Sequence, residues 1–202
     1  MKILCHRGLW QNPEEQNSIT SFIRARESGF GIDRGSQIVI AHDLPINESV
    51  LFSIYLHELN QRIHKGQIIA INIKADGLSD EINRLVKEYN LSNYFTFDMS
   101  IPEMLRYKTA GLNYFTRLSE YETKPVMLED AAGIWLDAFD SEWYNENYIN
   151  KLLEISKQVC IVSAELHGRN HIHQWGMIKR LNDHNNLMLC TDKPNEAKEY
   201  FK

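Results

Sequence analysis

Residues 2–8 read KILCHRG, a short apolar run that ends directly on a histidine, an arginine and a glycine. Runs of the same kind recur along the chain of 202 residues. Each is short and rich in Ile, Val, Phe, Tyr or Leu, which is typical of buried strands. We expect eight such strands, at residues 2–5, 37–41, 68–74, 94–97, 114–117, 134–136, 159–162 and 187–190.

Helical patterns lie between most of these runs. The first carries apolar residues at helical spacing and ends on Gly29, while Ser79 is a candidate N-cap for another. Pro125 breaks the helical signal over residues 119–130. The expected helices lie within residues 17–30, 78–90, 101–111, 145–158, 171–185 and 195–202.

This alternation predicts a parallel α/β fold. We expect one compact (β/α)8 TIM barrel over residues 1–202, because about eight strand-and-crossover units fill the chain. The alternative is a doubly wound open sheet. That fold usually carries a glycine-rich phosphate loop after its first strand, and CHRGLWQNP is not such a loop.

Composition narrows the class of protein and its location. The net charge of −5 and the pI of about 5.9 argue against a nucleic-acid binder with a basic surface. No apolar run approaches the roughly 18 residues of a membrane span. Cys5, Cys160 and Cys190 form no pairing pattern, so we expect buried free thiols, a reducing compartment and a cytoplasmic protein.

Ionisable or amide side chains follow nearly every predicted strand. In a TIM barrel such strand ends meet at one face, where the active site lies. Cationic residues there would hold an anionic group, whereas carboxylates could hold a cation or hydroxyl groups. The strand-end residues are His6, Arg7, His42, Asp43, Asn72, Lys74, Asp98, Arg117, Glu120, Asp137, Glu165, His167 and Asp192.

The segments CHRG, QNSITSFIRARESGFGI and GSQIVIAHD resemble the N-terminal half of glycerophosphodiester phosphodiesterases. They resemble still more the phosphatidylinositol-phospholipase-C-like phosphodiesterases of the same TIM-barrel superfamily. The resemblance implies that His6 and His42 are the acid/base pair on a phosphodiester, with His6 as base and His42 as acid. It further implies that Arg7 holds the phosphate and that Asn17 stands where the family has an Asn.

The chemistry of these residue types suits a phosphodiester. Two imidazoles that titrate near neutral pH can deprotonate the attacking hydroxyl and protonate the leaving oxygen. An arginine can pair bidentately with phosphoryl oxygens. We therefore expect a phosphoric diester hydrolase with a small-molecule glycerophosphodiester or phosphoinositide-type substrate. The further substrate-binding residues that we expect are Lys74, Arg117 and Glu165.

One segment departs from the family pattern. The resemblance implies a Mg²⁺ or Ca²⁺ site built on a Glu-x-Asp pair and a further Glu, but about five residues are absent after Ile32 and the third acidic position reads Asn72. Asp33 and Asn72 are left as metal-ligand candidates, although a turn is the more ordinary role for Asp33. Such a pair would be a weak site, because these ions take six or more oxygen ligands.

The same gap leaves two alternatives for the second strand and three for the chemistry. Either residues 30–32 and 37–40 form a hairpin, or the second strand is curtailed. Three alternatives exist for the chemistry. In the first the sequence omits a stretch of the chain, and in the second the reaction is metal-independent and Arg7 or Lys74 supplies the positive charge. In the third the protein is a degenerate barrel that binds phosphorylated ligands without turnover. A less favoured hypothesis is a glycosidase that uses Asp137 and Glu165.

Overall fold

The computed structural model describes residues 1–27, 31–36, 39–40, 50–60, 67–155, 157–181 and 183–202. The chain forms two compact units, one of Met1–Leu4 with Phe115–Lys202 and one of Cys5–Tyr114. Strand β1 (Lys2–His6) begins in the first unit and ends in the second. The single domain over residues 1–202 stays a prediction.

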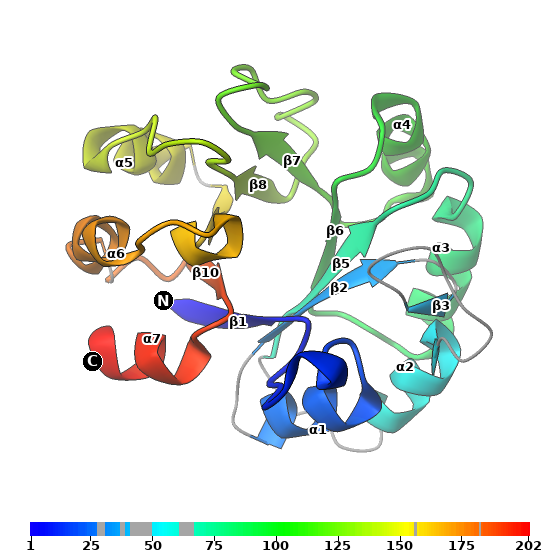
Figure 1. Ribbon diagram of the computed structural model, residues 1–202. Coiled ribbons are helices and arrows are strands. Elements are labelled where there is room, and N and C mark those ends of the chain that lie inside the picture. Colours follow the sequence, from blue (N-terminus) through cyan, green and yellow to red (C-terminus); the bar gives the residue numbers. More distant parts are fainter. Residues whose placement is uncertain (28–30, 37–38, 41–49, 61–66, 156, 182) are drawn as a thin grey trace. The chain divides into compact units, whose positions relative to one another are not determined.

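The unit Cys5–Tyr114 is built on parallel strands in the order β6-β5-β2-β1. Every residue of β5 except Asn72 is buried, as expected for a strand covered on both faces. Helices α2, α3 and α4 lie along one side of β2, β5 and β6 (Figure 1). The elements are β2 (Gly31–Ser36), β5 (Ile69–Ile73), β6 (Tyr94–Phe97), η1 (Pro13–Glu15), α1 (Ile19–Glu27), α2 (Phe52–Asn60), α3 (Ser79–Glu88) and α4 (Ile101–Ala110).

The second strand differs from both sequence expectations. Strand β2 covers Gly31–Ser36 and pairs in parallel with β5, so Asp33 lies in a strand and not in a turn. The hairpin alternative does not hold for the described residues of these two segments, because Gly31–Ser36 lie in β2, which pairs with β5, whereas β3 (Val39–Ile40) pairs antiparallel with β4 (Val50–Leu51). The parallel ladder to β5 satisfies the backbone of a segment whose glycines and charges read as a turn.

The N-terminus of α3 shows why Ser79 is not the N-cap. The cap position is Leu78, and Ser79 is the first helical residue. The Oε1 atom of Glu103 accepts hydrogen bonds from the backbone N–H of Leu78 at 3.1 Å and of Ser79 at 3.2 Å. A buried carboxylate from α4 therefore accepts from the backbone N–H groups at the helix start, a role that was expected of the Ser79 hydroxyl.

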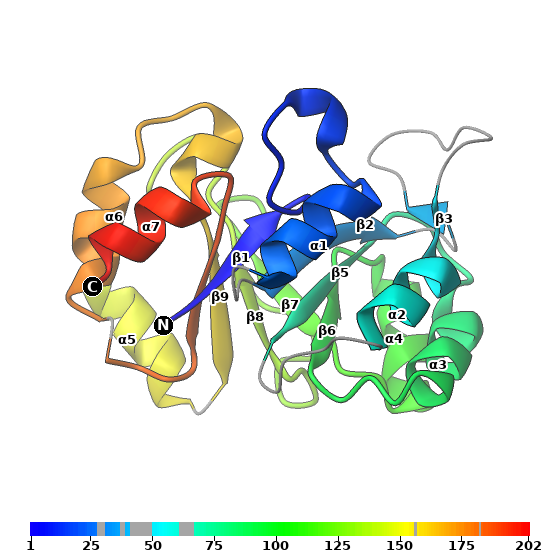
Figure 2. The same ribbon diagram turned by 90° about the horizontal axis from the view of Figure 1, so that it is seen from below.

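The unit with Phe115–Lys202 has parallel strands in the order β1-β10-β9-β8-β7. Helices α5, α6 and α7 lie beside β8, β9 and β10 (Figure 2). Trp175 of α6 is fully buried in the core of this unit. The elements are β7 (Phe115–Leu118), β8 (Gly133–Leu136), β9 (Gln158–Val162), β10 (Leu187–Thr191), η2 (Ala164–His167), α5 (Glu146–Glu154), α6 (Ile172–Lys179) and α7 (Pro194–Tyr200).

Three smaller expectations concern the connections, the thiols and the membrane. Residues 119–130, which the structure describes throughout, form bends and turns without a helix, as Pro125 predicted. Cys5, Cys160 and Cys190 are buried free thiols, as expected. Within the described ranges no helix combines the length and apolar character needed to cross a bilayer.

Candidate active site

The end of β1 places His6 and Arg7 in direct contact. Arg7 Nε donates to His6 Nε2 at 3.2 Å, and Arg7 Nη1 donates to Gln16 Oε1 at 2.8 Å. Arg7 has a φ of 57°, and the next residue, Gly8, has a φ of 87°. The chain thus turns sharply at the strand end, which brings the guanidinium group back beside the imidazole.

The segment before α1 holds this turn in place. The backbone carbonyl of Arg7 accepts hydrogen bonds from Asn17 N–H at 3.0 Å and from Ser21 Oγ at 3.2 Å. A Cβ atom on Gly8 would lie 2.5 Å from Ser21 Oγ, so only glycine allows this close approach. The sequence predicts Asn17 for this site, whereas Gln16 carries no signal there apart from its place beside Asn17.

Asn17 is itself strained and buried in part. Its φ is 59°, and its side-chain Oδ1 is buried with no hydrogen-bond partner among the residues that the structure describes. Buried polar atoms are nearly always hydrogen-bonded, so this oxygen, in the segment between η1 and α1, is a candidate acceptor for a ligand. Non-glycine residues held at positive φ also concentrate at functional sites.

Asn72 lies at the carboxyl end of β5, in register with Gly35 of β2 and Phe97 of β6. Its Nδ2 donates to Asp98 Oδ2 at 3.0 Å. Asp98 directly follows β6 and has a φ of 67°. Since β1, β2, β5 and β6 are consecutive in the sheet order, His6, Asn72 and Asp98 belong to the same edge of this unit's sheet.

Three further candidates have different outcomes. Lys74 directly follows β5 and is exposed, so its ammonium group is accessible at the same strand end. His42 lies outside the described residues, and its pairing with His6 stays a prediction. For Asp33 the structure describes the backbone in β2 and not the side chain, so its role as a ligand also stays a prediction.

Two predicted substrate-binding residues belong to the other unit and have protein partners there. Arg117 Nε forms an ion pair with Glu122. Glu165 accepts hydrogen bonds from the hydroxyls of Ser163 and Thr191 and from Asp192 N–H at 3.2 Å. These contacts join the ends of β9 and β10, which favours a structural role for Glu165. Its role in substrate binding stays a prediction.

The described side chains do not supply a metal site. Among them, no group of three or more His, Cys, Asp and Glu residues could hold an ion. Asn72 and Asp98 bring one amide and one carboxylate together, and a divalent cation takes six or more oxygens. The predicted Mg²⁺ or Ca²⁺ does not fit these residues alone.

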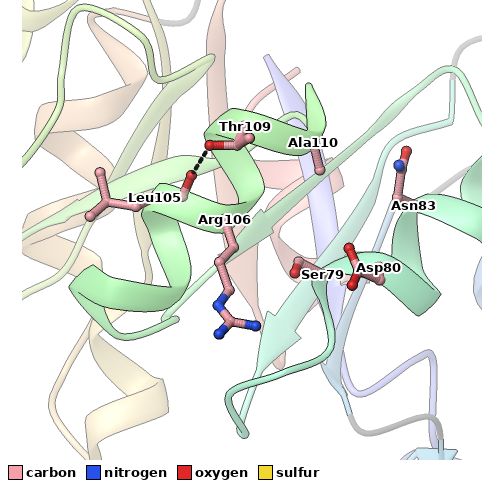
Figure 3. A pocket seen from close by; sticks show the side chains of 7 residues that line it. All are labelled: Ser79, Asp80, Asn83, Leu105, Arg106, Thr109 and Ala110. Carbon is pink, nitrogen blue, oxygen red and sulfur yellow. Dashed lines mark hydrogen bonds between the residues drawn. The ribbon is translucent and has the colours of Figure 1, made fainter.

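A surface hollow of about 370 Å³ lies between α3 and α4, and its lining residues include none of the predicted site residues (Figure 3). Ser79, Asp80 and Asn83 line it from α3, and Arg106 and Thr109 line it from α4, with Leu105 and Ala110. The α3 N-terminus beside it is already occupied by the Glu103 carboxylate. We interpret the hollow as an ordinary groove between two helices.

The fold is shared with solved phosphodiesterase structures, which confirms the α/β TIM-barrel prediction. A glycerophosphodiester phosphodiesterase from Agrobacterium tumefaciens aligns with a TM-score of 0.71 at 12% identity, over 99% of this chain and 98% of that one. A phosphodiesterase from Oleispira antarctica, in complex with its product sn-glycerol-3-phosphate, aligns with a TM-score of 0.69 at 12% identity, over 99% and 96% of the chains.

A different enzyme aligns less well. The phosphoribosyl anthranilate isomerase from Thermus thermophilus has a TM-score of 0.55 at 12% identity, over 100% of this chain and 95% of that one. No protein-family model matches the chain, and no curated protein matches it in sequence. At these identities the comparisons define the fold, and function is argued from the residues.

Proposed function

We propose that this protein is a phosphoric diester hydrolase that acts on a glycerophosphodiester or phosphoinositide-type substrate. The observation that carries the proposal is the direct contact between His6 and Arg7 at a strand end, in a chain with the fold of known phosphodiesterases. A general base beside a phosphate-binding guanidinium group is what the reaction requires.

Arg7 binds the phosphoryl oxygens. Gln16 accepts from its guanidinium group, and Asn17 and Ser21 donate to its backbone carbonyl, so the residue is held at the turn. The guanidinium group can turn from His6 to the phosphate and stabilise the negative charge that develops there. Lys74 adds a second positive charge after β5.

His6 removes the proton from the attacking hydroxyl, and His42 protonates the leaving oxygen. The Nε2 lone pair that accepts from Arg7 becomes available when the guanidinium group turns toward the phosphate. A hydroxyl adjacent to the phosphate on the substrate attacks phosphorus, its proton passes to His6, and a cyclic phosphate forms. As it forms, the bond from phosphorus to the leaving alcohol breaks, and that alcohol takes its proton from His42. Water then opens the cyclic phosphate and completes the hydrolysis: the water gives its proton to His42, and His6 returns its proton to the ring oxygen that is released.

The test is turnover of glycerophosphocholine and glycerophosphoinositol, measured as release of choline or inositol. It is run with Mg²⁺, with Ca²⁺ and with a chelator, on the natural chain and on His6→Ala. The proposal expects turnover that His6→Ala abolishes. Turnover that survives in His6→Ala at the natural rate would overturn it.

The second candidate is a barrel that binds phosphorylated ligands without turnover. It is favoured by the lack of a three-residue metal-ligand group among the described residues. This candidate expects no product under any of the ion conditions, together with binding of sn-glycerol-3-phosphate that Arg7→Ala removes. Product formation with any of the ions rules it out.

A further inference from the structure

The outer face of α4 carries two exposed apolar side chains that adjoin each other. Ile101 is 54% exposed and Leu105 is 53% exposed, and their spacing of four residues places them on the same side of the helix. The buried residues Met104 and Tyr107 lie on the other side of α4, so this pair faces away from the core of the unit. We call Ile101 and Leu105 the α4 ridge.

A groove runs directly beside the α4 ridge. It is the hollow of about 370 Å³ between α3 and α4, and Leu105 belongs to its lining. Figure 3 shows the side chain of Leu105 on the side of α4 away from Asp80 and Asn83 of α3. The ridge and the groove are therefore neighbours on one surface. Ridges of side chains pack into the grooves of neighbouring helices.

A surface of this kind is complementary in shape to a copy of itself. When a second copy is turned by 180°, the ridge of each copy can enter the groove of the other, which is the arrangement of an isologous contact. Single exposed apolar residues are common on protein surfaces. The pair on α4 differs from them because a groove that can receive such a pair lies beside it.

The charges at the groove are complementary in the same way. Asp80 lines it from α3 and Arg106 lines it from α4. The side chain of Arg106 is 66% exposed, and its ion pair with Glu103 is long, at 3.8 Å. Asp80 has no ion pair within the described ranges of the chain. The same rotation by 180° can place Arg106 of each copy opposite Asp80 of the other, and such opposed charges fix the register of a contact.

We propose that the protein forms a weak symmetric dimer in which the α4 ridge of each copy packs into the α3–α4 groove of the other. Each of the two helices has 10 residues, so the face is about 15 Å long. That size lies at the small end of specific interfaces, and we expect a Kd in the micromolar range. This inference does not rest on the proposed hydrolase function, because association can be measured without substrate.

The test is sedimentation equilibrium over protein concentrations from about 1 μM to about 300 μM, which bracket a micromolar Kd. We expect the average mass of the natural chain to rise from 23.6 kDa toward twice that value. Leu105→Glu should stay monomeric, because it places a charge in the contact. Ile172→Glu is the matched control, since Ile172 is 48% exposed on α6 of the other unit, and this variant should associate like the natural chain.

Two outcomes of this experiment contradict the proposal. A natural chain that stays monomeric over the whole range would leave the α4 ridge to a different protein. A dimer that Leu105→Glu leaves intact would place the contact on another surface. Far-ultraviolet circular dichroism of each variant shows that a lost dimer is not a lost fold.

A charge exchange tests the two-fold arrangement itself. Asp80→Lys and Arg106→Glu each place like charges opposite each other, so each should raise Kd by about tenfold. The double variant exchanges both charges and should restore the natural Kd to within about twofold. Arg106→Glu also brings a second carboxylate near Glu103, so Asp80→Lys alone is compared with the double variant if Arg106→Glu unfolds. A double variant that associates no better than Asp80→Lys would overturn the proposal.

Discussion

Two histidines at strand ends have opposite partners. His6, in the unit Cys5–Tyr114, accepts a hydrogen bond at Nε2 from a guanidinium group. His167, in the unit with Phe115–Lys202, is bonded at the same ring atom to a buried carboxylate. The neutral rings therefore differ in tautomer: Nδ1 carries the proton in His6 and is the acceptor in His167. These tautomers are assigned from the partners of each ring.

The difference teaches that the partner of a histidine, and not its position at a strand end, defines what it can do. A cation beside His6 prepares a site for an anionic group, which both residues can reach. A carboxylate beside His167 orients that ring and leaves Nδ1 as its acceptor. Changes at the residues around the two histidines should therefore have different effects.

The largest effect is expected at His6. His6→Ala should lower kcat/KM for glycerophosphocholine by roughly a hundredfold to ten-thousandfold, because a general base is lost. Choline release measures the rate, and circular dichroism checks the fold. His173→Gln, an exposed histidine with a surface partner, serves as the matched control and should retain the natural rate.

Arg7→Lys should have the next largest effect. A lysine keeps the charge but cannot pair bidentately with phosphate or reach His6 and Gln16 together. We expect kcat/KM to fall by about tenfold to a hundredfold. A rate equal to that of the natural chain would show that charge alone suffices and that the fork geometry of Arg7 has no role.

Gly8→Ala should be the most destabilising of these changes. Its Cβ would lie 2.5 Å from Ser21 Oγ and 2.9 Å from Phe22 Cδ1, at a φ of 87°. We expect a loss of about 2–4 kcal/mol in the free energy of unfolding, measured with urea. Gly77→Ala is the control, because Gly77 has a φ of 85° and nothing within 4 Å of the added Cβ. It should lose only about 1–2 kcal/mol from the backbone conformation.

Asp137→Asn should have a smaller effect on stability. An amide oxygen can still accept from Ala138 N–H and from His167, so the geometry survives while the charge is lost. We expect a loss of about 1 kcal/mol, the difference between a charge-assisted and a neutral hydrogen bond. A much larger loss, measured by the same urea titration, would mean that the amide of the variant cannot keep both contacts.

The smallest effect concerns Glu15, which supports the loop after Arg7. Donation from Arg24 at 2.8 Å, with Gln11 N–H, lowers the pKa of Glu15 below its usual 4.5. Its stabilising contribution is therefore present above the unfolded pKa and is lost as the pH falls through the lowered folded value. A carbon NMR titration should show the low pKa, and Arg24→Gln should raise it. An unchanged titration in Arg24→Gln would contradict the assigned cause.

The sequence predicted the apolar strands well because buried strands need continuous apolar runs. Residues 94–97 match β6 at both ends, and the Gly111 stop of α4 is also observed. Strand β2 was not recognised, because Asp33, Arg34 and two glycines carry no apolar periodicity. Its strand character comes from the ladder to β5, which no local pattern contains.

The candidate site was predictable only in part. His6 and Arg7 stood out because charge follows an apolar run directly. The contact of Arg7 with Gln16 and the pairing of Asp137 with His167 join residues far enough apart that no spacing rule connects them. The ring contacts of Tyr121 and Phe139 could not be predicted, because each is a single aromatic residue in a loop and its neighbours come together only in the fold.

The shared strand β1 has a consequence for the order of folding during synthesis. Its hydrogen-bonded neighbour in the unit with Phe115–Lys202 is β10, almost at the other end of the chain. Lys2, Ile3 and Leu4 are synthesised long before β10, so they must wait for the residues between the two strands before this neighbour exists. Closing so long a loop is slow. These residues are thus among the last to reach their native neighbours in that unit.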